Sequence, residues 1–447
     1  MSGKFSDLAK QVVDKAQSWG ADQSEAFLIK SKDLTIDVRD GTVETMKVAE
    51  DRGLGVRIFK EGRIGFAYTS DLGNQAVDVI IRQALANSEK TSPDEHNFMP
   101  KPGGQYASLN LLDPQIKKTS VEDKIELARA IEKAARSYDP RITNTERSSY
   151  FDAEYEVTIF NSFGIAAGYE GSYCGSYADL VAEENGESQT GFAIKMTLNY
   201  SNLNPEKVGL EASEKAVRKL GAKTIGTQKA VIVFDPYIAT SFLGVIAPAL
   251  SAEAVQKGKS LFGGKVGRKV ASDKITIIDY GSMPGGIASA PFDGEGVPTA
   301  KTVLVQNGEL KCYLHNTYTA AKDGVLSTGN GTRGSFKSTP EVGTTNFYIE
   351  PGQTDPDDLI KDIGAGLYVT DVMGMHTANP ISGDFSVGAA GLWIENGKFT
   401  KPVRGVAIAG NILELLTEVE GIGSDLTFFG GQGAPTIRIS KMTISGV

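Results

Sequence analysis

The sequence is poor in cysteine and histidine, the residues that most often build metal sites and disulfide frameworks. Its 447 residues include 2 cysteines, Cys174 and Cys312, and 3 histidines. Two cysteines this far apart supply neither a disulfide framework nor the paired spacing of a zinc site. Such sparing use of cysteine is typical of a reducing compartment, so we expect a cytoplasmic protein.

Long apolar runs and basic clusters are also missing. No stretch reaches the ~18 apolar residues of a membrane helix. Residues 1–20 carry charges throughout, unlike a secretory signal. The net charge is −9, with no Lys/Arg cluster, which disfavours a nucleic-acid-binding surface because phosphate contacts dominate such affinity. We therefore expect neither a membrane nor a nucleic acid as a direct partner.

Glycine, by contrast, is abundant, with 51 residues in a chain that is 40% hydrophobic. This apolar content is enough for sizeable cores, and the spread of glycine indicates many turns between strands. The length predicts two or three domains.

Residues 1–90 are predicted to form an N-terminal unit that begins and ends with a helix. Apolar residues recur at three- and four-residue spacing over 5–19 and again over 72–88. The following residues, 91–118, contain Pro, Asn and Gly without a clear period, and we interpret them as a linker or a long surface connection.

Two hairpins are expected between these helices. Asp40-Gly41 is a strong signal for a tight turn, and it would join strands at 34–38 and 43–48. A second hairpin is predicted over 53–68. The N-terminal unit would thus contain four short strands.

The central unit, 119–224, is predicted to repeat the order of helix, strands and helix. Ser120 is placed to cap a helix that runs to about residue 137. Alternating segments fill 142–199, and a helix with proline in its first turn spans 205–220.

The C-terminal domain, 225–447, is predicted to be rich in sheet. It opens with a buried strand at 230–234 and a largely apolar helix at 237–256, and only 410–418 interrupts the later strands as a helix. Because the strands alternate and short turns join them, the predicted fold class is α+β, with N-terminal α/β-hairpin units and antiparallel or mixed sheets in the C-terminal domain.

Catalytic patterns are scarce. None of His96, His315 and His376 has a histidine or carboxylate four residues later, so no His-Glu-x-x-His zinc helix is present. The glycine-rich segment 327–334 lacks the Gly-Lys-Ser/Thr ending of a phosphate-binding loop. Asp279, Asp293 and Glu295 could cluster as carboxylates, but we expect them to lie in a solvated loop. The residues alone predict no recognisable catalytic set.

Several segments nevertheless resemble the TldD/PmbA family over nearly the whole chain. Residues 53–66 are similar to the opening hairpin of the family. The more specific matches lie in the C-terminal domain: 314–320, 327–331, 345–348, 366–370, 383–388, 393–397 and 408–411. These later segments resemble the PmbA/TldE branch in particular.

The resemblance implies a zinc peptidase built from a TldD and a TldE subunit. In TldD, a His-Glu-x-x-x-His helix and a downstream cysteine hold the zinc, and the glutamate activates the bound water. Aligned on residues 257–267, the two histidines fall at Leu243 and Pro248 and the glutamate at Gly244, and no cysteine follows Cys312. The chain is therefore expected to hold no metal or other cofactor, to be inactive alone, and to leave the zinc to its partner.

The family further implies a cleft for unfolded or short peptide substrates, shaped jointly with a TldD-like catalytic subunit. Extended peptides could bind there by pairing with a strand edge. The candidate cleft residues are His315, Asn316, Thr328, Asn330 and Arg333. Without the catalytic partner, a homodimer is plausible.

Two other readings stay open. The chain could be a self-sufficient peptidase that uses unpredicted ligands such as His315 or His376. It could instead be a regulatory protein-binding factor, as the older family label, modulator of DNA gyrase, suggests.

Overall fold

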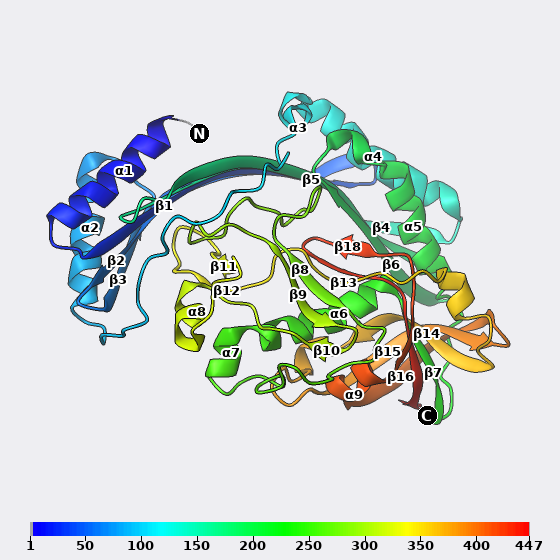
Figure 1. The fold of residues 1–447 in the computed structure, drawn as a ribbon. Coiled ribbons are helices and arrows are strands. Elements are labelled where there is room, and N and C mark those ends of the chain that lie inside the picture. Colours follow the sequence, from blue (N-terminus) through cyan, green and yellow to red (C-terminus); the bar gives the residue numbers. More distant parts are fainter. Residues whose placement is uncertain (1–2, 447) are drawn as a thin grey trace.

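The computed structural model describes residues 3–446. A long curved sheet forms an arch over a compact body built from the C-terminal half of the chain (Figure 1). The arch has the strand order β3-β2-β1-β4-β5-β6, and all neighbours are antiparallel. Its strands are β1 (Gln23–Arg39), β2 (Thr42–Lys60), β3 (Arg63–Thr69), β4 (Ile142–Asn161), β5 (Ala166–Glu184) and β6 (Glu187–Thr197).

The predicted turn at Asp40-Gly41 joins β1 to β2. Both residues have positive φ, 51° and 70°, the backbone that a tight two-residue hairpin turn requires. The expected strands at 43–48 and 53–59 are one continuous strand, however, since residues 49–52 keep pairing with β1. The prediction of four short strands was wrong. Residues 49–52 are exposed, and three of them, Glu50, Asp51 and Arg52, are charged. Their charge reflects contact with solvent and does not mark a turn.

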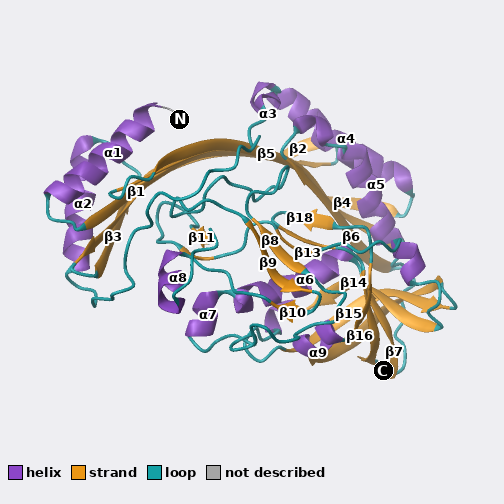
Figure 2. Cartoon of the chain, viewed as in Figure 1, coloured by secondary structure: helices purple, strands orange, loops and turns teal. Residues whose placement is uncertain are grey.

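Helices cover the convex side of the arch in two groups (Figure 2). At one end, α1 (Gly3–Ser18) and α2 (Asn74–Ser88) bury apolar residues of β1 and β2. At the other end lie α3 (Pro114–Lys118), α4 (Val121–Tyr138) and α5 (Pro205–Val217), with a 3-10 turn at Tyr200–Asn202. Ser120 caps α4 by accepting a hydrogen bond from the Asp123 N–H, as predicted. The helices predicted within residues 1–224 are thus confirmed within a few residues.

One pairing joins the expected N-terminal and central units into a single sheet. β1 pairs with β4 from Glu25 opposite Asn161 to Val38 opposite Ser148. Most of the segment between the units is not helix or strand, but it is anchored, because Met99 and Leu111 are buried.

The body contains two mixed six-stranded sheets, ordered β16-β15-β14-β7-β20-β17 and β10-β9-β8-β13-β19-β18, in which β7–β14 and β13–β19 are parallel. Helix α6 (Pro236–Ile246) contacts strands of both sheets. The fold class α+β with antiparallel and mixed sheets is confirmed.

The remaining elements are β7 (Gln228–Phe234), β8 (Ile277–Tyr280), β9 (Lys301–Gln306), β10 (Glu309–Leu310), β11 (Gly331–Thr332), β12 (Glu341–Val342), β13 (Phe347–Ile349), β14 (Ala365–Met373), β15 (Asp384–Glu395), β16 (Lys398–Asn411), β17 (Val419–Ile422), β18 (Thr427–Phe429), β19 (Gln432–Ala434), β20 (Ile437–Ser445), α7 (Ala252–Gln256), α8 (Thr317–Asp323), α9 (Ile412–Thr417) and 3-10 turns at Ala247–Leu250, Pro356–Leu359 and Met375–Thr377.

The long apolar helix expected over 237–256 is broken. It ends at Ile246, passes through a 3-10 turn that contains Pro248, and restarts at Ala252 with Ser251 as its cap. Proline has no N–H to continue the helical hydrogen bonds, and a serine cap favours a new start. Within residues 3–446, every helix is too short or too polar to span a lipid bilayer.

Candidate functional site

The positions that match a zinc helix lie on α6 and on the turn that follows it. Leu243 is 1% exposed in the main core, and Pro248 is exposed where the helix breaks. At Gly244 an added Cβ would lie 3.2 Å from the Gln432 side chain. None of the three has a side chain that can bind a metal. Among residues 3–446, no group of three or more His, Cys, Asp or Glu is placed to hold an ion.

Three of the predicted cleft residues form a partly buried hydrogen-bond chain. The His315 N–H donates to Thr328 Oγ1 at 2.9 Å, and the Thr328 hydroxyl donates to Asn330 Oδ1 at 2.7 Å. Asn330 Nδ2 then donates to Asp279 Oδ2 at 2.7 Å. Burial lowers the pKa of His315, and its Nδ1 has no hydrogen-bond partner. These hydrogen bonds tie the loop at 327–330 to β8 and to the residue before the α8 cap, and a role of the three residues in a cleft stays a prediction.

The other two predicted residues lie next to cavities. Asn316 caps α8 in a reciprocal pair with Thr319 and lines a hollow that also contains His96 and Tyr318. Arg333 lines a different, larger cavity below the arch. The structure therefore connects four of the five residues along one loop and helix cap, and places Arg333 apart.

The carboxylates expected in a solvated loop are buried, so that expectation was wrong. Asp279 and Glu295 are each 1% exposed and Asp293 is 7% exposed. Asp293 accepts backbone N–H bonds from Glu295, Val297 and Gly331 at 2.9, 3.0 and 2.7 Å. Burial, followed by the charge of Glu295, raises the pKa of Asp293 to about 7.

Two carboxylates and two guanidiniums join the arch to the body through a buried ion cluster. Glu25 on β1 pairs with Arg57 on β2 at 2.8 Å and with Arg333 of the body, and Arg57 also pairs with Glu295 at 3.1 Å. The side chains are between 0% and 6% exposed. Arg333 further stacks over the Phe27 ring at 4.7 Å. The cluster is balanced in charge, as buried ions must be.

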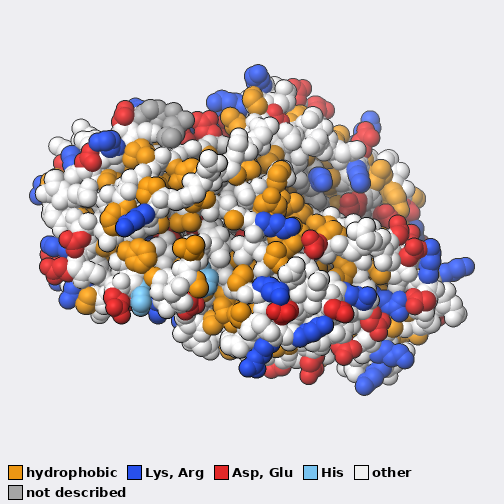
Figure 3. Space-filling view, viewed as in Figure 1, with side chains coloured by type: hydrophobic (Ala, Val, Ile, Leu, Met, Phe, Trp, Pro, Cys, Tyr) orange, Lys and Arg blue, Asp and Glu red, His pale blue; other side chains and the backbone are white. Residues whose placement is uncertain are grey.

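Next to this cluster, an aromatic cavity of about 360 Å³ opens between the concave face of the arch and the body. Figure 3 shows hydrophobic side chains gathered in the hollow below the arch. Its roof comes from β1, β4 and β5, and its floor from residues 287–294 and the loops near 333 and 345. The apolar lining side chains are Phe27, Ile29, Tyr155, Val157, Tyr169, Tyr173, Ile287 and Phe292.

The rings in this cavity, which we call the aromatic cleft, are held by neighbours across the sheet. Tyr155 lies over Gly171, where a Cβ would come within 2.5 Å of its ring. Tyr169 meets Phe292 edge to face at 5.1 Å. Sequence reasoning missed these residues. The available signal was tyrosines on the same face of two neighbouring strands, with Tyr155 opposite Gly171.

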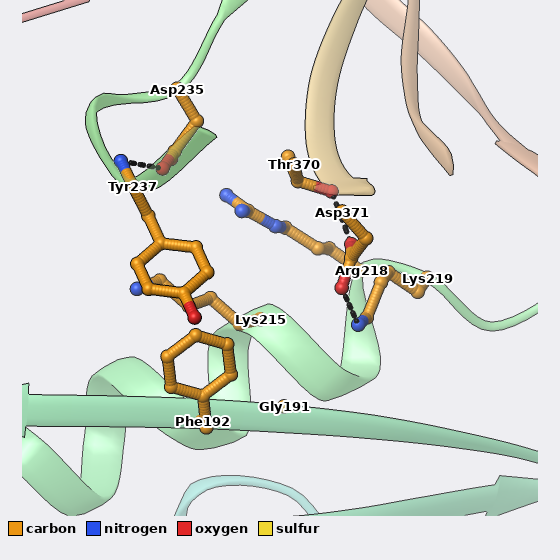
Figure 4. Close-up of a pocket in the computed structure, with 9 residues that line it drawn as sticks. All are labelled: Gly191, Phe192, Lys215, Arg218, Lys219, Asp235, Tyr237, Thr370 and Asp371. Atoms are coloured by element: carbon orange, nitrogen blue, oxygen red, sulfur yellow. Dashed lines mark hydrogen bonds and ion pairs between the residues drawn. The ribbon is translucent and has the colours of Figure 1, made fainter. Parts of the chain in front are cut away.

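A second, small pocket lies at the seam between α5 and the body (Figure 4). Lys219 pairs with Asp371 at 3.0 Å, and Asp235 caps α6 by accepting from the Tyr237 N–H at 2.8 Å. The Arg218 side chain extends into the space between Asp235 and Thr370 (Figure 4). Burial raises the pKa of Asp235. The lining carries three cationic side chains, Lys215, Arg218 and Lys219, against two carboxylates, Asp235 and Asp371.

Comparison with known proteins agrees with this geometry. Models of the PmbA/TldA metallopeptidase match domain 1 over residues 24–88, the central domain over 114–220 and the C-terminal domain over 227–446. Metalloprotease PmbA of Escherichia coli O157:H7 is 31% identical over 99% of this chain and 96% of that protein. The PmbA homolog of Haemophilus influenzae is 28% identical over 97% of this chain and 94% of its own length.

Solved structures show the same architecture over the full chain. TldE from Thermococcus kodakarensis superposes with a TM-score of 0.91 at 26% identity, covering 98% of this chain and 100% of that one. A Thermotoga maritima protein that carries the name modulator of a DNA gyrase has a TM-score of 0.91 at 28% identity, covering 99% and 100%.

Proposed function

Because the chain belongs to the PmbA/TldD metallopeptidase family, we propose that it is the non-catalytic, TldE-type subunit of a two-subunit zinc peptidase. In this role a TldD-like partner supplies the metal and the catalytic glutamate, and the present chain completes the substrate-binding surface.

The observation that carries the proposal is the chemistry of α6. Leu243, Gly244 and Pro248 occupy the positions that match the family's zinc-binding residues, and none can bind a metal or take a proton. Leu243 packs into the main core instead. Apolar packing in place of metal ligands supports a role in which a partner chain supplies the catalytic residues.

The aromatic cleft gives the chain a positive role. Its rings offer apolar and π surfaces of the kind that bind peptide side chains with little sequence selectivity. Asp293 and Arg333 line the same cavity and supply polar contacts at its floor. We therefore propose that unfolded or short peptides enter this cleft, with apolar or aromatic side chains against Tyr155, Tyr169 and Tyr173.

A photo-crosslinkable peptide with aromatic residues tests this role in a mixture of the chain and a TldD-like subunit. The proposal expects labelling of this chain, and about tenfold weaker binding for Tyr173→Ala, since a stacked ring contributes roughly 1.4 kcal/mol. Tyr138→Ala is the matched control, because Tyr138 is 42% exposed on α4. Labelling of the TldD-like subunit alone would contradict the proposal.

A further inference from the structure

The outer edge of β2 is open along half of the strand. β3 pairs with β2 only from Leu54 to Lys60, so within the part of the chain that is described, residues 42–53 have β1 as their only strand partner. Asp51 also forms a 4.0 Å ion pair with Lys337. Every residue from Thr42 to Arg52 is exposed. An edge of this kind presents a row of backbone N–H and C=O groups that can pair with another strand.

Apolar side chains accompany this open edge. Val43 is 37% exposed, and Met46 and Val48 are each 55% exposed. Val48 also lines a surface hollow with Leu112 and Val121, which are each 39% exposed. Charged residues lie along the same edge, namely Glu44, Lys47, Glu50, Asp51 and Arg52. Such charges restrict pairing to registers that match opposite signs, and clustered apolar side chains beside a free edge mark a protein interface.

We propose that this edge pairs antiparallel with the same edge of a second copy of the chain, forming one sheet through both arches. The two-fold axis passes through Val48. A two-fold axis perpendicular to a sheet does not exchange the two faces of the sheet. Directly opposed residues of the two copies must therefore lie on the same face, which requires their residue numbers to differ by an even number. The axis must therefore fall on a residue, and the middle of the open edge offers Lys47 or Val48.

Charge selects between these two registers. An axis at Lys47 sets two lysines face to face and places Glu44 opposite Glu50, which is repulsive. An axis at Val48 places the two valines together and Glu44 opposite Arg52 of the second copy, twice by symmetry. Favourable opposite charges and an apolar centre therefore coincide in one register.

The extent of the open edge fits the same register. With the axis at Val48, the segment that pairs between the two copies runs from Val43 to Gly53. It ends next to Leu54, where β2 begins to pair with β3. Glu44 already bridges Arg39 of its own chain at 3.3 Å, but both side chains are exposed, so this contact is weak and can be shared. The inference concerns this chain alone and does not rest on the proposed peptidase role.

Cysteine trapping of the full-length chain tests the register. Val48→Cys is expected to form a disulfide-linked dimer on mild oxidation, because the two positions face each other across the axis. Val79→Cys is the control, since Val79 is 63% exposed on α2, outside the edge. The unmodified chain controls for Cys174 and Cys312.

Charge-reversal variants test the same interface through the equilibrium between monomer and dimer. The wild-type chain should sediment at twice its 47.5 kDa mass. Glu44→Arg and Arg52→Glu should each weaken dimerisation about tenfold, as two symmetry-related pairs become repulsive, and the double reversal should restore it. A wild-type monomer, a dimer that neither Val48→Cys traps nor the reversals weaken, or trapping only to an added TldD-like chain would each overturn the proposal.

Discussion

Glu25 gives the most demanding test of how the arch is held on the body. Its carboxylate is 0% exposed and bridges Arg57 and Arg333. In Glu25→Gln the shape is kept but the charge is lost, leaving Arg333 with the carbonyl oxygens of Gly294 and Ser338 as its remaining acceptors. Removing one partner of a buried ion pair leaves an uncompensated charge, so we expect a loss of about 3–5 kcal/mol in unfolding free energy.

The assay is urea unfolding, followed by the fluorescence of the chain's 2 tryptophans. Trp19 packs against the core of the arch and Trp393 lies in the core of the body, so together they report both sides of the cluster. Asp14→Asn is the matched control. Its partner Lys10 and Asp14 itself are 68% and 60% exposed, and breaking such a pair should cost less than about 0.5 kcal/mol.

A double variant decides whether the charge, rather than the shape of the site, is responsible. In Glu25→Gln with Arg333→Gln, both members of one pair become neutral, so the double variant should lose clearly less than the sum of the single variants. Additive losses, or a Glu25→Gln variant within about 0.5 kcal/mol of wild type, would refute the view that this cluster joins the arch to the body.

Further consequences concern a packing contact and one titration. Phe336 is 0% exposed and its ring lies against Gly53, so Phe336→Ala should cost about 3–5 kcal/mol in chemical denaturation. A cost below about 1 kcal/mol would contradict this contact. The folded-state pKa of Asp293 is raised from 3.8 to about 7. The preference of the folded state for protonated Asp293 therefore adds fully to stability below about pH 4, and this contribution is lost as the pH rises to about 7. Asp293→Asn should remove this loss, gaining up to about 4 kcal/mol relative to wild type between those pH values; a pH-independent difference would exclude the raised pKa.

Local elements of the fold could be predicted from the sequence. Helical periodicity located α1, α2, α4 and α5, and the Asp40-Gly41 turn located the first hairpin. The joining of β1 to β4 could not be predicted, because the two strands are far apart along the chain and polar residues lie on both. Pro248 was visible in the sequence, but only the packing of α6 shows that the helix stops there.

In the candidate site, too, some features could be proposed from the sequence and others are seen only in the structure. The alignment of Leu243, Gly244 and Pro248 with the zinc helix rests on the resemblance and stays a prediction. The burial of Asp293 and its neighbours could not, because spacing does not reveal which loop is covered. The pair between Glu25 and Arg333 spans 308 positions and exists only because the arch closes over the body.

Zinc content and peptidase activity of the purified chain, measured alone and after mixing with a TldD-like subunit, test the central claim most directly. The account predicts no stoichiometric zinc and no activity for the chain alone, and activity above that of the partner alone on mixing. One zinc per chain, together with peptidase activity in the absence of any partner, would contradict it.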